Sequence, residues 1–127
     1  MAETKKILII DDEEDVITYL STFFNDNGFD TITAGNGKIG VQKAISEKPD
    51  VITLDVSMPD ESGIKALKEL QNNETTKSTP IIMVTGVSTD VKRFIGSTKQ
   101  VHPPEAFFEK PIDRDELLKK VKELLNL

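Results

Sequence analysis

The sequence predicts an α/β fold, a parallel five-stranded sheet covered by helices on both faces. Short apolar runs alternate five times with longer stretches that are mostly amphipathic. The apolar runs are nearly continuous, as expected of parallel strands buried on both faces, rather than alternating with polar residues. A chain of 127 residues is long enough for one domain with its own core.

The first unit pairs a strand over residues 6–11 with a helix over residues 13–27. The strand contains four consecutive apolar residues, Ile7 to Ile10. In the helix Val16, Leu20 and the pair Phe23-Phe24 recur at helical spacing. Gly28 follows as a helix stop.

The second unit has a weaker strand over residues 29–34 and a helix over residues 36–48, which Pro49 ends. We expect Val41, Ala44 and Ile45 to face the core.

The third and fourth strands cover residues 51–55 and 80–85 and are almost entirely apolar. A loop with Met58-Pro59 leads from the third strand to a helix, whose inward residues at helical spacing are Ile64, Leu67 and Leu70.

The region after the fourth strand gives the weakest signal. Val91, Phe94 and Ile95 predict a short helix that Gly96 weakens. A short fifth strand follows over residues 106–109. Asp113 caps the last helix, with Glu116 three residues on as in a capping box. The apolar stripe of that helix consists of Leu117, Leu118, Val121, Leu124 and Leu125.

Composition excludes several classes of protein. The absence of cysteine excludes disulfides, zinc–thiolate sites and thiol catalysis. A net charge of −6 without a long basic run argues against nucleic-acid binding by this domain. The start of the chain has neither a signal peptide nor a membrane span, so we expect a cytoplasmic location.

Charged residues follow three of the predicted strands. Asp11-Asp12 ends the first, Asp55 ends the third, and Lys110 follows the fifth, before Pro111. The carboxyl ends of parallel strands meet at one edge, where open α/β folds bind ligands. Because clustered carboxylates repel one another without a cation among them, the pattern predicts a divalent metal there. The lysine would meet an incoming negative charge.

These residues, with Thr85 at the end of the fourth strand, closely resemble the receiver domain of bacterial two-component response regulators. The motif residues are Asp11 and Asp12, then Asp55 with Met58, Pro59 and Gly63, then Thr85, and finally Lys110 with Pro111. The resemblance covers roughly residues 5–125, so we interpret residues 1–127 as a single receiver domain without an output domain. It implies a flavodoxin-like fold with strand order 2-1-3-4-5.

The resemblance also implies the chemistry. Asp55 would accept a phosphoryl group from the phosphohistidine of a histidine kinase. Mg²⁺ would be held by Asp12, Asp55 and the backbone carbonyl of Ser57, with Asp11 acting mainly through a bound water. Lys110 and the metal would screen the charge that transfer of an anion to a carboxylate brings together. The chain would catalyse only its own phosphorylation and dephosphorylation, and no other cofactor is implied.

Two residues would couple phosphorylation to a change in conformation. Thr85 would hydrogen-bond the phosphoryl oxygens, and Phe107 aligns with the aromatic switch residue that moves with that threonine. An ordinary core position for Phe107 is an equally good interpretation, since Phe108 lies beside it. Partners would be a sensor kinase or phosphotransfer protein, and a downstream target or fused output domain. A homodimer could form through the fourth helix, fifth strand and last helix.

The stretch between Thr85 and Lys110 is a few residues longer than the family's usual pattern, which leaves partner choice and dimer mode open. His102, followed by two prolines, is interpreted as a loop residue. Ser57 and Val87 occupy positions that tune access of the hydrolytic water, and neither supplies an acid or an amide. We therefore expect that self-dephosphorylation is not unusually fast; a phosphoryl half-life of only seconds would contradict this.

Three other functions fit the pattern less well. A haloacid-dehalogenase-like phosphatase also uses a strand-end aspartate and Mg²⁺, but it needs a second acid where Ser57 stands. A flavin-binding module needs a phosphate loop after the first strand, where this chain has four acidic residues from Asp11 to Glu14. A receiver-like interaction module that is never phosphorylated would not need Asp55 or Lys110.

Overall fold

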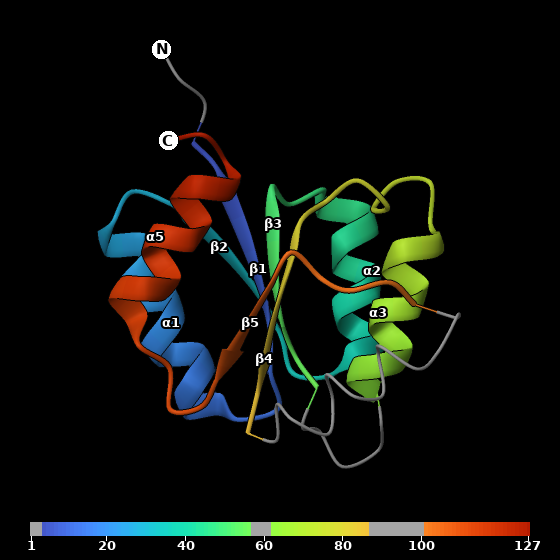
Figure 1. Cartoon of the computed structure of the whole chain (residues 1–127), viewed down its shortest axis with the longest axis horizontal. Helices are drawn as coiled ribbons and strands as arrows, with labels where there is room; N and C mark the ends of the chain where they lie inside the picture. The colour runs from blue at the N-terminus through green and yellow to red at the C-terminus, as the bar shows by residue number, and fades with distance from the viewer. Residues whose placement is uncertain (1–3, 57–61, 87–100) are drawn as a thin grey trace.

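The computed structural model describes residues 4–56, 62–86 and 101–127. Within them, five parallel strands form one sheet in the order β2-β1-β3-β4-β5, which confirms the predicted fold class and strand order (Figure 1). The strands are β1 (Lys6–Ile10), β2 (Asp30–Ala34), β3 (Val51–Asp55), β4 (Ile81–Thr85) and β5 (Ala106–Glu109). The helices are α1 (Glu14–Asp26), α2 (Gly37–Glu47), α3 (Ser62–Asn72) and α5 (Arg114–Leu124).

The helices form a layer on each face of the sheet. Figure 1 shows α1 and α5 on one face and α2 and α3 on the other. Every residue of β3 and β4 is buried, as expected of central strands covered on both sides. The apolar residues accordingly form two clusters, one on each face of the sheet.

The register of the strands places their carboxyl ends at one edge. Ile10, the last residue of β1, pairs with Leu54 of β3, and Asp55 pairs with Val84 of β4. Thr85 pairs with Glu109 of β5. The residues that end or follow these strands therefore meet at that edge, where the sequence predicts the site.

Local signals in the sequence explain where the helices begin and end. The side chain of Asn36 accepts a hydrogen bond from the Ile39 N–H at the start of α2. Asp113 caps α5 as predicted, because its side chain accepts hydrogen bonds from the N–H groups of Asp115 and Glu116. Gly28, just past α1, has a φ of 90°, a conformation that glycine adopts without strain.

One predicted core residue is wrong. Val41 and Ala44 of α2 are buried, but Ile45 is 36% exposed. The buried stripe of α2 instead runs through Gly37, Gly40, Val41 and Ala44, and Ile45 lies at its margin. The short helix predicted around residues 91–95 lies outside the described residues.

Candidate functional site

Four acidic residues gather at the carboxyl edge of the sheet. Asp11 and Asp55 are buried, with 3% and 1% of their surfaces exposed, whereas Asp12 and Glu13 are exposed. One carboxylate oxygen from each residue can be chosen so that all four oxygens lie within 4.8 Å of one another. The structure thus brings Asp11, Asp12 and Asp55 together as predicted and adds Glu13.

Lys110 reaches into this cluster from the end of β5. Its Nζ lies 3.2 Å from Asp11 Oδ2, 3.4 Å from Asp55 Oδ2 and 2.7 Å from Glu13 Oε1. Its backbone N–H donates a hydrogen bond of 2.9 Å to the carbonyl oxygen of Thr85. The main chain of Lys110 is therefore tied to the end of β4, and its side chain compensates the acidic cluster.

The electrostatics of the cluster follow from burial and mutual charge. Burial raises the pKa of Asp11 to about 6, and the charge of Asp55 acts in the same direction. A hydrogen bond from the Glu13 N–H, 2.8 Å from Asp11 Oδ1, opposes this shift, as does Lys110. For Lys110, burial alone would lower the pKa, but the bond to Glu13 and the charges of Asp55 and Asp11 together raise it. Lys110 is therefore charged at neutral pH.

Asp11→Asn is expected to stabilise the metal-free protein at neutral pH. The folded state holds the Asp11 proton up to pH about 6, whereas the unfolded chain releases it near 3.8, so wild-type stability falls as pH rises between these values. A pKa shift of this size corresponds to about 3 kcal/mol of free energy of unfolding, which the wild type loses as the Asp11 proton is released. The amide side chain of the Asp11→Asn variant has no such proton, so the variant keeps this stability. Urea unfolding in a chelator from pH 3 to 8 measures the difference, which should vanish below pH ~4.

Asp30→Asn, the same change at an exposed residue of β2, serves as the control for the loss of one carboxylate. If wild type and Asp11→Asn show the same dependence of stability on pH, the charged Asp11 carboxylate is not destabilised by burial.

The other residues singled out in the sequence are Thr85, Phe107, Ser57 and His102. Thr85 is fully buried at the end of β4, and Phe107 of β5 is partly buried against the cluster of apolar residues on the α2 and α3 face. Ser57 lies outside the described residues. His102 is exposed, and its backbone N–H and carbonyl both bond the side-chain amide of Gln71, consistent with a loop residue.

Sequence reasoning missed the part that Glu13 plays. From sequence, an acid at Glu13 has an ordinary explanation, because acidic residues are common at helix starts, where the helix dipole favours them. Glu13 is indeed the N-cap residue of α1, but its side chain makes no capping hydrogen bond. It bonds Lys110, 97 residues away in the chain, so the only signal in the sequence was an extra acid beside the Asp pair.

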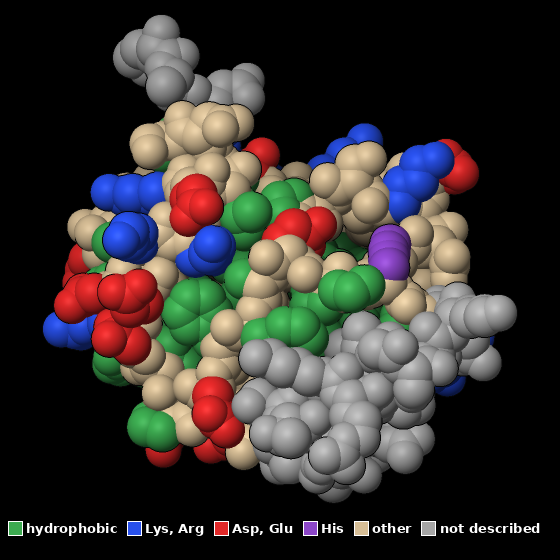
Figure 2. All heavy atoms as spheres, viewed as in Figure 1, with side chains coloured by type: hydrophobic (Ala, Val, Ile, Leu, Met, Phe, Trp, Pro, Cys, Tyr) green, Lys and Arg blue, Asp and Glu red, His purple; other side chains and the backbone are tan. Residues whose placement is uncertain are grey.

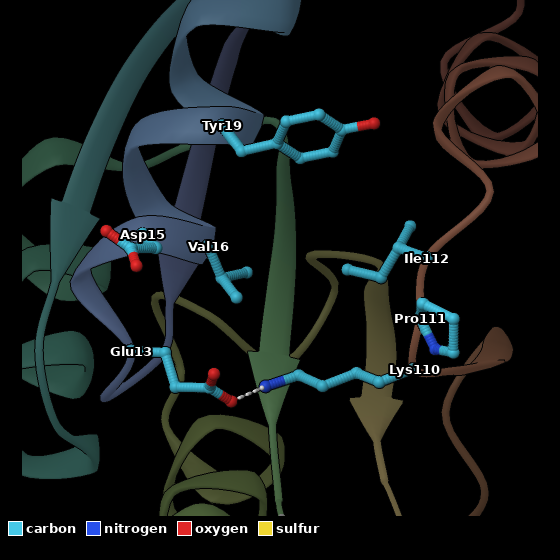
Figure 3. A pocket seen from close by; sticks show the side chains of 7 residues that line it. All are labelled: Glu13, Asp15, Val16, Tyr19, Lys110, Pro111 and Ile112. Carbon is cyan, nitrogen blue, oxygen red and sulfur yellow. Dashed lines mark hydrogen bonds and ion pairs between the residues drawn. The ribbon is translucent and has the colours of Figure 1, made fainter.

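A groove of about 730 Å³ opens beside the cluster, between α1 and the segment after β5 (Figure 3). Val16 and Tyr19 line it from α1, and Pro111 and Ile112 line it from the opposite side. The bond between Glu13 and Lys110 crosses one end of the groove, so the cluster lies next to a largely apolar surface.

The family model for the response regulator receiver domain matches residues 7–122. The chain belongs to this family. Among its relatives, the receiver is 35% identical to the alkaline phosphatase synthesis transcriptional regulatory protein PhoP of Bacillus subtilis, over 95% of this chain and 48% of PhoP. It is 31% identical to protein PilH of Pseudomonas aeruginosa, over 94% of this chain and 97% of PilH.

Solved structures agree with the fold of this receiver domain. The chemotaxis protein CheY4 of Vibrio cholerae superposes with a TM-score of 0.83 at 28% identity, covering 96% of this chain and 99% of CheY4. The receiver spans about half the length of PhoP but nearly all of PilH, so its relatives include both longer and similarly sized proteins. No helix within the described ranges has the length and apolar character needed to span a bilayer.

The ligand chemistry of this receiver domain fits a hard divalent cation. Carboxylate oxygens are the ligands that Mg²⁺ takes, and Mg²⁺ uses one or two carboxylates with several waters. The pair of buried carboxylates, Asp11 and Asp55, with exposed Asp12 beside them matches this preference. Burial is the main reason that the pKa of Asp11 is raised, and a cation bound beside Lys110 would relieve the added repulsion from Asp55.

Proposed function

We propose that this receiver domain is a phosphorylation-dependent switch that accepts a phosphoryl group on Asp55. The observation that carries the proposal is the position of Asp55, buried at the end of β3 with Oδ2 3.4 Å from Lys110 Nζ. Asp55 is also within reach of the carboxylates of Asp11 and Asp12. Phosphoryl transfer to an aspartate needs a nucleophilic carboxylate, a set of cation ligands and a lysine beside them.

The proposed reaction is an in-line displacement. An Asp55 oxygen forms a bond to phosphorus as the bond from phosphorus to a histidine nitrogen of the donor breaks. The electron pair stays on that nitrogen, which a proton neutralises. Lys110 compensates the charge that builds on the phosphoryl oxygens. Its backbone hydrogen bond to Thr85 keeps it at the edge of the sheet while its side chain adjusts.

Asp11, Asp12, Asp55 and the backbone carbonyl of Ser57 would hold Mg²⁺, with Asp11 acting through water. When bound, Mg²⁺ supplies positive charge that screens the transferring phosphoryl oxygens. Asp12 would be a direct ligand and Asp11 would act through water, while Asp55 would both hold the ion and act as the nucleophile.

Thr85 and Phe107 would couple phosphorylation to a change in the partner-binding surface. Thr85, buried at the end of β4, would hydrogen-bond the arriving phosphoryl oxygens. Phe107 pairs with Met83 across β4 and β5 and packs on the α2 and α3 side of the sheet. A shift of Thr85 would change the packing around β5 and thereby the surface that partners meet.

The partners we propose are a histidine kinase or phosphotransfer protein as donor, and a downstream protein or fused output domain as target. On the face that Figure 2 shows, hydrophobic side chains gather in the middle, beside mixed acidic and basic ones. Ala106, Phe108 and Ile112 are partly buried apolar residues in and after β5. This supports a protein-binding or homodimer surface that includes β5 and α5. The domain would act in the cytoplasm.

The test uses the metal-free protein, Mg²⁺ and a small phosphodonor such as acetyl phosphate. Intact-mass measurement should show a single phosphoryl adduct that needs Mg²⁺. Failure to label with the donor and with a panel of histidine kinases would contradict the proposal. Steady hydrolysis of phosphate esters would instead indicate a phosphatase of the haloacid-dehalogenase type.

A further inference from the structure

Lys110 is shared unequally among three carboxylates. Its Nζ lies nearest Glu13, at 2.7 Å, and farther from Asp11 and Asp55, at 3.2 and 3.4 Å. The side chain of Glu13 is 58% exposed, whereas those of Asp11 and Asp55 are 4% and 1% exposed. Figure 3 shows Glu13 reaching from the start of α1 toward Lys110 at the end of β5. Glu13 is therefore the outermost of the three partners.

This arrangement creates a competition between two cations. The carboxylates that Lys110 contacts from inside the cluster, Asp11 and Asp55, are also those that suit a divalent ion. Two cations that share the same buried carboxylates repel each other strongly, because little water screens them. A divalent ion at these carboxylates would therefore push Lys110 away from Asp11 and Asp55.

The backbone limits how Lys110 can withdraw. Its N–H donates a hydrogen bond of 2.9 Å to the Thr85 carbonyl oxygen. We therefore expect the side chain, and not the backbone, of Lys110 to move. Glu13 offers the ammonium a second acceptor on the solvent side, and the Glu13 carboxylate is not engaged in capping α1. A lysine held there still lies beside Asp55, where the phosphoryl group would arrive.

We propose that Glu13 is a positioning residue that draws Lys110 away from Asp11 and Asp55 when Mg²⁺ binds and keeps it within reach of the phosphoryl group. The inference rests on the proposed function, because it assumes a cation at Asp11, Asp12 and Asp55. Without Glu13, Lys110 has only Asp11 and Asp55 as partners in the cluster and competes with the ion for them.

The test is direct titration of the metal-free protein with Mg²⁺, followed by NMR of the backbone amides. Glu13→Gln should weaken Mg²⁺ binding about tenfold or more. Glu14→Gln, the same change at the exposed neighbouring residue of α1, reports the effect of losing one nearby charge and should weaken binding less. Lys110→Ala should tighten binding, because the competing cation is gone.

The decisive comparison is Glu13→Gln in the Lys110→Ala background. If Glu13 acts through Lys110, its effect there should shrink to that of Glu14→Gln. An equally large loss in both backgrounds would overturn the inference and make Glu13 a direct ligand. No loss in either background, or weaker binding by Lys110→Ala, would also overturn it. Amide spectra of each variant confirm that the fold is kept.

The Mg²⁺ titrations distinguish a failure of the proposed function from a failure of the role assigned to Glu13. If the wild-type protein shows no Mg²⁺ binding at all, the proposed function itself is contradicted. If the wild type binds Mg²⁺ but the effect of Glu13→Gln does not depend on Lys110, only the assignment of Glu13 is wrong.

Discussion

Asp55→Asn is expected to abolish phosphoryl labelling while leaving the protein folded. An amide has no anionic oxygen with which to form an acyl phosphate, yet it keeps the volume and shape of the carboxyl group at a position that is 1% exposed. Lys110 keeps Asp11 and Glu13 as partners in the variant. Labelling with a small phosphodonor and Mg²⁺, followed by intact mass, should show no adduct, against near-complete conversion of the wild type.

Asp30→Asn provides the matched control, because it makes the same change at an exposed residue at the beginning of β2 and should label normally. Thermal unfolding of both variants checks the fold. Undiminished labelling of folded Asp55→Asn would contradict the assignment of the phosphoacceptor.

Gly63→Ala is expected to slow phosphorylation at least about tenfold, although Gly63 carries no chemical group. A Cβ at Gly63 would lie 2.5 Å from the carbonyl oxygen of Asp55 and 2.5 Å from Cα of Val56. Both are main-chain atoms, so they cannot move without shifting β3 or the first turn of α3. Overpacking of this kind costs about 1–3 kcal/mol, and here the displaced backbone carries the nucleophile.

Gly40→Ala is the matched control. Its Cβ would meet side-chain atoms of Ile10, and no main-chain atom of the site is among the nearest contacts. Both variants should lose stability, measured by urea unfolding, but only Gly63→Ala should lose labelling rate under conditions where both are folded. Equal rates for the two variants would show that Gly63 does not position Asp55.

The sheet could be predicted from sequence because its signal is strong at each strand. Apolar runs such as Ile7 to Ile10 form strands that are buried on both faces. The residue at the end of each run therefore lies at the carboxyl edge of the sheet. Asp11, Asp55 and Lys110 thus come together through topology alone. Asp113 could be assigned because a helix cap is a local interaction.

Other features depend on where side chains lie in three dimensions. Ile45 differs from the buried residues of α2 by one step around the helix, which periodicity alone does not resolve. The bond from Glu13 to Lys110 spans 97 residues, and a helix-start acid gives no hint of its partner. The close approach of Gly63 to Asp55 likewise appears only once α3 is packed against β3.

Locating the adduct in the phosphorylated protein shows whether Asp55 is the phosphoacceptor. Phosphorylated protein can be reduced with borohydride, which converts an acyl phosphate to a stable alcohol, and then digested and sequenced by mass spectrometry. We expect the modified residue to be Asp55 alone. Modification of Asp11 or Asp12 in place of Asp55 would contradict it.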